Sequence, residues 1–347
     1  MLYFHNDYNE ICHPDVLRKM TDGAAMQMPG YGMDDACARA AKQIRTLCKN
    51  DDLSVHFLVG GTQTNLTVIA AALRPYQGVI AVDSGHINVH ETGAIEATGH
   101  KVIALPTADG KITAQQIDEA AFSQSNTMDP EHTVQPKMVY ISQSTEWGTV
   151  YNLAELEAIS AICRKYGLYL FVDGARLGYA LESNGCDVTL ADLARLSDVF
   201  YIGGTKVGAM FGEAVVISNP AIAQDFRYMI KQRGGMLAKG WLLGLQFEAL
   251  LENNLYFEIS AHANRQAGKI RSTLAELGYS LYIPNESNQI FPILPDALLA
   301  ELGKNFTFSE MHRTDETHRV VRFCTSWATK PENADALCAA LREFSKI

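Results

Sequence analysis

The sequence predicts an α/β protein with a mostly parallel central sheet covered by helices and a smaller C-terminal α+β domain. From about residue 35 to residue 218, short apolar runs alternate with helical patterns. The runs are apolar throughout, which is typical of strands buried on both faces of a parallel sheet. After residue 218, long helical patterns are followed by weaker strands. These three observations together favour the α/β class.

The expected elements follow from the same patterns. Strands are expected at residues 54–59, 78–83, 101–105, 137–142, 168–173, 198–204 and 213–218. Helices are expected at residues 34–50, 62–74, 91–99 and 153–167. The last part is expected to form helices at 220–232, 236–252, 254–277 and 331–345, with strands at 288–294 and 319–326. We therefore divide the chain into an N-terminal segment (1–20) that packs on the body, a large domain (21–245) and a small domain (246–347).

Composition restricts the function. The 347 residues carry a net charge of −10 without a basic cluster, which argues against nucleic-acid binding. No apolar run approaches the roughly 18 residues of a membrane span, and the N-terminus lacks the pattern of a signal peptide. Seven scattered cysteines form no C-x-x-C pair, which indicates reduced thiols in a cytoplasmic protein and no metal site.

The first of three polar clusters at strand ends is Gly60-Gly61-Thr62-Gln63, within "LVGGTQTNL". In parallel sheets, ligands bind just beyond the carboxyl ends of the strands. Free backbone N–H groups and the dipole at a helix start bind an anion, and Thr62 adds a hydroxyl. The sequence lacks the spacings of a dinucleotide fingerprint and of a P-loop, which favours a single phosphate. An ordinary N-cap role for Thr62 remains the alternative.

The second cluster is "LFVDGARLGYAL", in which Asp173 directly follows four apolar strand residues. An acceptor-only carboxylate there suits a protonated ring nitrogen. Arg176 offers a planar fork for a carboxylate or a phenolate. A structural ion pair between Asp173 and Arg176 remains the alternative.

The third cluster is "DVFYIGGTKVGAMFGEAVVI", which places Lys206 in an apolar setting. A lysine that cannot stay solvated tends to lose its proton, and a neutral amine forms a Schiff base with a carbonyl. An exposed loop lysine is the alternative. The three clusters together match the needs of pyridoxal phosphate, namely an anion cradle, an aspartate for the ring nitrogen and an amine.

The stretches "GYGMDDAC", "GGTQTNL", "DSGHINVHETGAIEATG", "FVDGARLGYAL" and "GGTKVG" resemble the threonine aldolase / aromatic amino acid β-eliminating lyase family of fold type I pyridoxal-phosphate enzymes. The resemblance covers essentially the whole chain. It implies that Lys206 forms the Schiff base and that Asp173 pairs with the pyridine nitrogen. The other residues that it places at the cofactor are Gly61, Thr62, Gln63, His86 (stacked on the ring), Arg176 and Thr205. For His86 an ordinary turn histidine is the alternative.

The resemblance also implies that Arg176 and Arg322 hold the substrate carboxylate. A surface arginine on a strand edge is the alternative for Arg322. Tyr31 is expected to approach the site of a neighbouring subunit, because the family builds its sites between subunits. The resemblance therefore implies a homo-oligomer, a dimer of dimers with shared active sites.

Two departures from the family pattern concern the substrate. Asn6 stands where a serine usually contacts the substrate carboxylate, and its amide can still donate a hydrogen bond. In "SQSTEWGTVY", Glu146 and Trp147 replace the usual histidine and asparagine. A carboxylate can act as the base for the β-hydroxyl proton, so Glu146 joins His86 as a catalytic candidate; a surface-loop position is the alternative. Trp147 favours a larger or aromatic substrate side chain.

The predicted reaction is retro-aldol cleavage of a β-hydroxy-α-amino acid, of the L-threonine or L-allo-threonine type, to glycine and an aldehyde. The nearest alternative is another pyridoxal-phosphate lyase reaction, either β-elimination or cleavage of bulky substrates such as phenylserine. A nicotinamide dehydrogenase is disfavoured, because the glycine fingerprint is absent. A non-catalytic cofactor-binding protein is supported only by the changed loop at 145–147.

Overall fold

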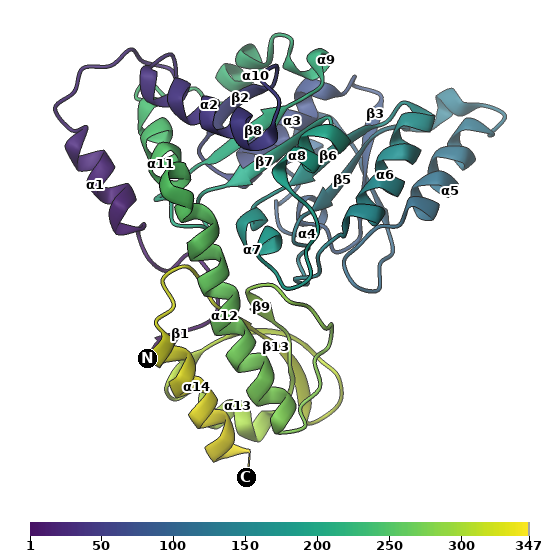
Figure 1. Ribbon diagram of the computed structural model, residues 1–347. Helices are drawn as coiled ribbons and strands as arrows, with labels where there is room; N and C mark the ends of the chain where they lie inside the picture. The colour runs from purple at the N-terminus through teal and green to yellow at the C-terminus, as the bar shows by residue number, and fades with distance from the viewer. Residues whose placement is uncertain (346–347) are drawn as a thin grey trace.

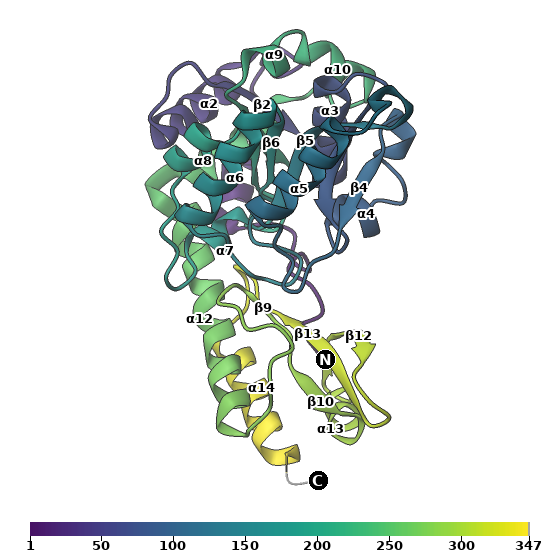
Figure 2. The ribbon, with the colours of Figure 1, turned by 90° about the vertical axis from the view of Figure 1, so that its right-hand side faces the viewer.

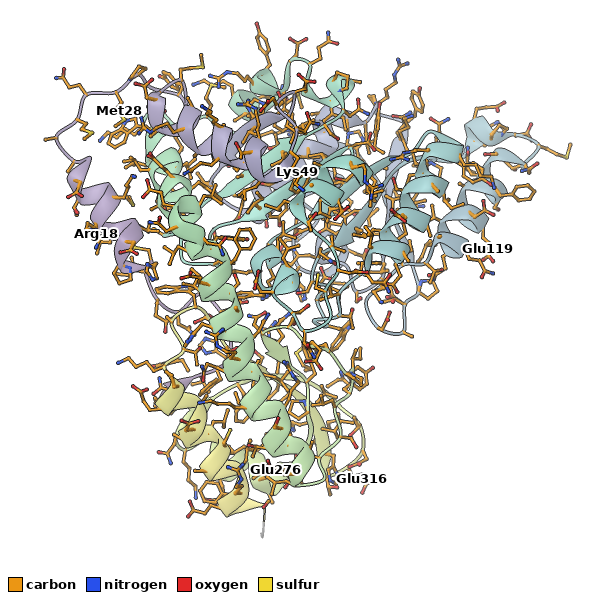
Figure 3. All side chains as sticks on the ribbon, in the orientation of Figure 1. Arg18, Met28, Lys49, Glu119, Glu276 and Glu316 are labelled. Atoms are coloured by element: carbon orange, nitrogen blue, oxygen red, sulfur yellow. The ribbon has the colours of Figure 1, made fainter. Side chains whose placement is uncertain are left out.

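The computed structural model describes residues 1–345 and shows a larger body joined to a smaller one by a long helix (Figures 1 and 2). Charged side chains such as Arg18, Glu119 and Glu276 project outward from both bodies (Figure 3). Within residues 1–345, no helix is both long and apolar enough to cross a membrane.

The larger body contains a seven-stranded sheet in the order β2-β8-β7-β6-β5-β3-β4. Its strands are β2 (Ser54–Leu58), β3 (Gln77–Val82), β4 (Val102–Leu105), β5 (Gln135–Ser142), β6 (Tyr169–Asp173), β7 (Val199–Gly203) and β8 (Glu213–Ile217). The pairs from β7 through β4 are parallel, and β8 runs antiparallel to both of its neighbours. The predicted mostly parallel sheet is confirmed, and all seven expected strands are present.

Helices cover both faces of this sheet, because alternate residues of its strands enter two separate cores. Val139 and Val172 pack in one core with α2, α5, α6 and α8, whereas Met138 and Phe171 pack in the other with α3, α9 and α10. The helices of this body are α2 (Asp35–Cys48), α3 (Gly61–Ala72), α4 (His86–Val89), α5 (Ala114–Ser125), α6 (Leu153–Tyr166), α7 (Leu177–Leu181), α8 (Leu190–Leu196), α9 (Pro220–Ala223), α10 (Phe226–Gln232) and α11 (Trp241–Leu251), with short 3-10 turns η1 (Glu96–Thr98) and η2 (Pro130–His132).

The smaller body is a second sheet with helices on one side. After the turn η3 (Glu252–Asn254), α12 (Leu255–Glu276) runs from the larger body into the smaller one (Figure 1). The remaining elements are β9 (Gln289–Ile290), β10 (Ile293–Pro295), α13 (Asp296–Leu302), β11 (Phe306–Thr307), β12 (Ser309–Arg313), β13 (His318–Cys324) and α14 (Pro331–Phe344). The predicted smaller α+β part is confirmed. Residue 246 lies inside α11, and the division of the chain at that point stays a prediction.

The N-terminal segment contacts both bodies. Strand β1 (Leu2–Tyr3) pairs in parallel with β11, and α1 (Pro14–Asp22) packs against α11.

Two helix predictions were wrong in detail. The helix expected at 91–99 is reduced to η1, because Thr92 and Gly93 adopt positive φ. The helix expected at 220–232 divides at Asp225, which also has a positive φ.

Candidate active site

A cavity of about 340 Å³ lies beyond the carboxyl ends of β2, β5, β6 and β7. It is closed on one side by the N-terminal segment through Tyr8. The cavity is lined by Tyr8, Val59, Gly60, Gly61, Thr62, Asn65, His86, Ser142, Ser144, Glu146, Asp173, Ala175, Arg176, Tyr201, Thr205, Lys206 and Glu213. The sheet thus brings together residues from all three predicted clusters.

The N-terminus of α3 opens into this cavity. Gly60 holds the N-cap position with extended backbone (φ −173°) and offers no side chain to cap the helix. A Cβ on Gly60 would meet nothing within 4 Å, so the space in front of the helix start is open. The helix therefore presents free N–H groups and its positive dipole end to an anion. The alternative role of Thr62 as the N-cap is wrong.

Asp173 ends β6 and is 4% exposed. Its Oδ1 accepts hydrogen bonds from the Tyr201 hydroxyl and, at 2.9 Å, from the Ala175 N–H. Its Oδ2 accepts from the Tyr140 hydroxyl and, at 3.1 Å, from Asn65 Nδ2. Burial and the Asp173 charge raise the pKa of both tyrosines well above the usual value, so both remain donors. Four donors thus fix the position and orientation of the Asp173 side chain in the cavity lining.

Lys206 follows β7 and lines the same cavity, so it is not an exposed loop lysine. Its backbone carbonyl accepts a hydrogen bond from the Tyr179 hydroxyl (2.5 Å), which fixes the turn. Burial, together with the positive charge of Arg176, lowers the pKa of the Lys206 amine. A larger fraction of this amine is therefore neutral and nucleophilic than is usual for lysine.

Glu213 lies across the turn that carries Lys206. Its carboxylate accepts hydrogen bonds from Gly204 N–H (3.0 Å) and Thr205 Oγ1 (2.8 Å). Burial raises the pKa of Glu213 to about 8. The hydroxyl of Thr205, a predicted cofactor residue, thus donates its hydrogen bond to Glu213. This contact fixes the loop before Lys206.

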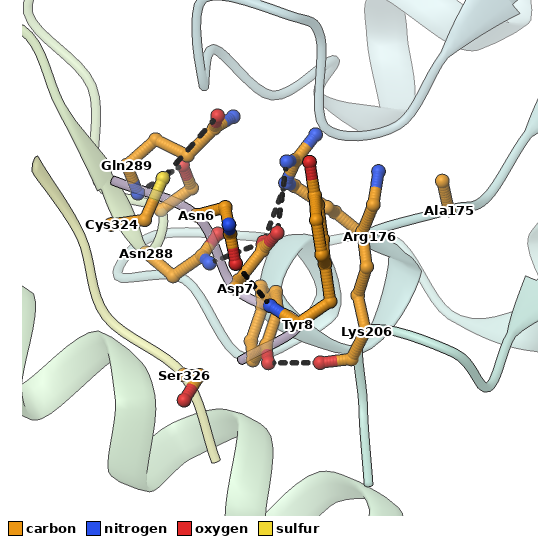
Figure 4. Close-up of polar contacts among 12 residues, drawn as sticks. Asn6, Asp7, Tyr8, Ala175, Arg176, Lys206, Asn288, Gln289, Cys324 and Ser326 are labelled. Atoms are coloured by element: carbon orange, nitrogen blue, oxygen red, sulfur yellow. Dashed lines mark hydrogen bonds and ion pairs between the residues drawn. The ribbon is translucent and has the colours of Figure 1, made fainter. Parts of the chain in front are cut away.

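Arg176 forms a two-pronged ion pair with Asp7 of the N-terminal segment (Figure 4). Its Nε and one terminal nitrogen donate to the two Asp7 oxygens at 2.7 and 3.0 Å. Asn288 adds a hydrogen bond to Asp7 at 2.9 Å. Although burial acts in the opposite direction, the charges of Arg176 and Lys206 lower the pKa of Asp7 to about 2. The alternative ion pair of Arg176 with Asp173 is therefore replaced by one with Asp7.

Glu146 and His86 contact each other in the lining of the same cavity. Glu146 Oε1 accepts hydrogen bonds from Ser142 Oγ (2.7 Å) and the His86 backbone N–H (3.0 Å). Glu146 Oε2 is buried and has no partner within residues 1–345. Burial raises the pKa of Glu146. Glu146 lines the cavity, so a surface-loop position is not observed. Its unpartnered Oε2 is buried and has to turn toward the cavity to meet a ligand hydroxyl.

Four predicted site residues do not line the cavity. Gln63 turns its side chain to Val59 N–H and the Arg233 carbonyl. The Asn6 side chain accepts from the backbone of Tyr8. The other two are Arg322, whose guanidinium contacts the His5 carbonyl, Gln289 and Ser309, and Tyr31, which lines a separate cavity.

Trp147 also points away from the cavity. Its ring packs against Phe291 and Tyr282 of the smaller body, with ring centroids 5.1 and 5.3 Å apart. The inference that Trp147 selects a larger substrate side chain therefore has no support in this arrangement.

Sequence reasoning missed several lining residues, among them Tyr8, Asn65, Ser142, Tyr201 and Glu213. Ser142 ends a predicted strand, so its position at a strand end was a usable signal. Tyr201 and Glu213 lie inside apolar strand patterns that predict core positions. Tyr8 reaches the cavity only through the path of the N-terminal segment (Figure 4).

The cavity fits pyridoxal phosphate, the expected cofactor. The open start of α3 suits its phosphate, and the fixed Asp173 carboxylate suits its ring nitrogen. Lys206 supplies the amine to hold the aldehyde carbon. All three groups line one cavity, as a single ligand requires.

Comparisons with known proteins agree with this assignment. The family described as "Beta-eliminating lyase" matches residues 13–296. The low specificity L-threonine aldolase of Pseudomonas aeruginosa is 33% identical over 344 residues, which is 97% of this chain and 96% of that protein. A solved structure of Leishmania major threonine aldolase superposes with a TM-score of 0.97 at 48% identity, covering 99% of this chain and 100% of that one. Thermus thermophilus aspartate aminotransferase shares the fold, with a TM-score of 0.71 at 16% identity and coverage of 99% and 91%.

Proposed function

The chain belongs to the β-eliminating lyase family, and from that premise we propose that it cleaves L-threonine-type β-hydroxy-α-amino acids to glycine and an aldehyde. It is a pyridoxal-phosphate-dependent lyase of fold type I. The observation that carries the proposal is that the α3 start, Asp173 and Lys206 share one cavity with the side chain of Glu146. The first three groups hold the cofactor, and the fourth faces the substrate.

The chain's own residues divide the work as follows. The N–H groups of Gly61 and Thr62 bind the phosphate, and Asp173 keeps the ring nitrogen protonated. Lys206 would hold the cofactor through Nζ. Pyridoxal phosphate, when bound, accepts the electrons of the Cα–Cβ bond that breaks. A bond set perpendicular to the cofactor ring breaks most readily, so the protein must orient the substrate.

Proton removal from the β-hydroxyl falls to the wall formed by Glu146 and His86. The Glu146 carboxylate accepts the hydroxyl proton as the Cα–Cβ bond breaks, directly or through a water held by His86. The raised pKa of Glu146 makes this carboxylate a stronger base than a solvated one. The departing aldehyde then leaves glycine, which takes its new proton at Cα.

The substrate carboxylate needs a cation, and two arginines compete for that role. Arg176 is engaged by Asp7, so its position suits the cofactor's phenolate better than a mobile substrate. Arg322 has a buried Nε without a partner in the described chain, but its guanidinium lies outside the cavity, on Gln289, His5 and Ser309. The family resemblance assigns the substrate carboxylate to Arg322 and Asn6, and this assignment requires both side chains to turn toward the cavity when the substrate binds.

The assembly and location extend the proposal. We infer a homo-oligomer, a dimer of dimers, in which Tyr31 of one subunit approaches the neighbouring site. Tyr31 and Met33 are 47% and 67% exposed and form an apolar edge that a second copy would cover. A cytoplasmic location is supported by the seven cysteines, all free.

The test is aldehyde release from L-threonine, L-allo-threonine and phenylserine, with added pyridoxal phosphate and a Lys206→Ala control. We expect aldehyde and glycine in equal amounts from the wild type and none from the control. A 2-oxo acid with ammonia, and no aldehyde, would instead assign β-elimination. Because Trp147 does not line the cavity, phenylserine is expected to gain no advantage over threonine.

A further inference from the structure

Behind the cavity wall, a chain of hydrogen bonds joins His86 to Asp173. The members are His86, Glu91, Asn65 and Asp173. His86 Nδ1 lies 2.7 Å from Glu91 Oε1, and Asn65 Nδ2 lies 2.6 Å from the same oxygen. Asn65 Nδ2 also donates to Asp173 Oδ2 at 3.1 Å. The chain therefore links the residue expected to stack on the cofactor to the residue expected to bind its ring nitrogen.

Glu91 is an unusual residue to find in this place. Its side chain is 0% exposed, and no lysine or arginine pairs with it in the part of the chain that the structure describes. Burying a carboxylate without such a partner is costly unless hydrogen bonds compensate. The donors that approach Glu91 are His86 and Asn65, and both line the cavity. Both hydrogen-bond partners of the Glu91 side chain are therefore residues of the cavity lining.

The donor and acceptor groups around Asn65 and His86 determine which atoms carry the hydrogens between them. Both neighbours of Asn65 Nδ2 are carboxylates, so only the NH₂ end of the amide fits between them, with one hydrogen for each. Glu91 Oε1 already accepts a hydrogen bond from Asn65, and the same oxygen accepts from His86 when the proton of that contact is on Nδ1. The second ring nitrogen, Nε2, is then left as an acceptor. The ring plane is fixed at the same time, because a hydrogen bond at 2.7 Å restricts its rotation.

We propose that Glu91 is a positioning residue that sets the tautomer and ring plane of His86, and that Asn65 fixes this pair relative to Asp173. This proposal rests on the proposed function, because the role of His86 beside the cofactor is part of that function. Its effect is to present one defined face of His86 and an unprotonated Nε2 to the cavity.

The direct test is ¹⁵N NMR of the histidine-labelled protein without cofactor. We expect the His86 signal of the wild type to show protonated Nδ1. In Glu91→Ala, the proton should move to Nε2, which neutral imidazole prefers when free. Glu91→Gln should keep the proton on Nδ1, because its amide oxygen can accept where Glu91 Oε1 does. Glu96→Gln, an exposed carboxylate five residues away, is the matched control and should change nothing.

A kinetic measurement separates positioning from folding. At saturating cofactor, Glu91→Ala should lower kcat about tenfold, as expected for a displaced group. KM for threonine should change less than about threefold, since ground-state binding is untouched. Glu91→Gln should recover most of the lost kcat. An unchanged kcat, or a loss confined to KM, would overturn the proposal.

If Glu91→Ala does not fold, a second variant, Asn65→Ala, tests the same proposal. Asn65→Ala leaves the contact between Glu91 and His86 but removes the bridge to Asp173. It should keep the Nδ1 proton and raise the Kd for pyridoxal phosphate about tenfold, the cost of about one hydrogen bond. Wild-type affinity in Asn65→Ala, or an unmoved proton in Glu91→Ala, contradicts the inference. If the proton moves in Glu91→Ala as expected but the wild type releases no aldehyde, only the proposed function is refuted.

Discussion

At the scale of single residues, the pairing of Asp7 with Arg176 decides what this arginine can do. Both oxygens of Asp7 are occupied by the guanidinium, and Asp7 is fully buried. A guanidinium held in this way is a fixed charge that helps to lower the pKa of Lys206. The Asp7 charge acts on Lys206 in the opposite direction and raises the pKa of its amine, so Asp7 influences the site although it does not line the cavity.

Replacing Asp7 by asparagine should destabilise the protein. The change leaves the Arg176 charge buried and unpaired, and breaking such a pair costs about 3–5 kcal/mol. Urea unfolding of the protein without cofactor measures this loss. Asp15→Asn is the control, because the pair of Asp15 with Arg18 is exposed and should be worth less than about 1 kcal/mol. Equal losses in the two variants would contradict the assignment.

The same pair predicts a pH dependence of stability. The folded-state pKa of Asp7 is lowered from 3.8 to about 2, so its stabilisation is fully present above pH 4 and is lost as the pH falls toward 2. Between pH 5 and pH 3 the wild type should lose about 1 kcal/mol more than Asp7→Asn. The difference between the two unfolding free energies isolates this group, and a constant difference over that range would refute it.

At the scale of elements, the start of α3 has no side-chain cap. This lowers the stability of the helix but leaves its first N–H groups free to bind an anion. Gly60→Asp should raise the unfolding free energy of the cofactor-free protein by about 1 kcal/mol, because aspartate is a good N-cap. The same carboxylate would occupy the phosphate position, so the Kd for pyridoxal phosphate should rise more than about tenfold. Thermal unfolding and an absorbance titration measure the two effects.

Gly60→Ser is the matched control for this helix start. Serine caps the helix without adding charge, so it should stabilise the protein and weaken cofactor binding far less than aspartate does. If aspartate and serine weaken binding equally, the phosphate does not bind at the α3 start.

The loop after β5 connects the site to the smaller body. Trp147 packs on Phe291 and Tyr282, while the adjacent Glu146 faces the cavity. Trp147→Ala should cost about 2–4 kcal/mol of stability and lower kcat, because the loop loses its anchor. The ratio of kcat/KM for phenylserine to that for threonine should stay within about twofold. Trp147→Phe should retain most of the stability, and a large change in the substrate ratio would restore a direct specificity role.

At the scale of the whole molecule, the N-terminal segment joins the two bodies. β1 pairs with β11, Phe4 accepts a hydrogen bond from Cys324 N–H, and Asp7 binds Arg176 and Asn288. Removing residues 1–9 should therefore abolish activity and separate the unfolding of the two bodies into two transitions. Calorimetry of the shortened chain tests this, and a single transition at the wild-type temperature would contradict it.

The sequence by itself determined the α/β class, all seven strands of the large sheet, the cofactor and the strand-end residues Asp173 and Lys206. It did so because continuous apolar runs and polar residues directly after them are local signals, and because the motifs around them resemble a known family. Only the tertiary structure decided that Asp7 pairs with Arg176, that Trp147 faces the smaller body, and that Glu91 reaches His86 and Asn65. These contacts join segments distant in sequence or lie within irregular chain, where no periodicity indicates which way a side chain points.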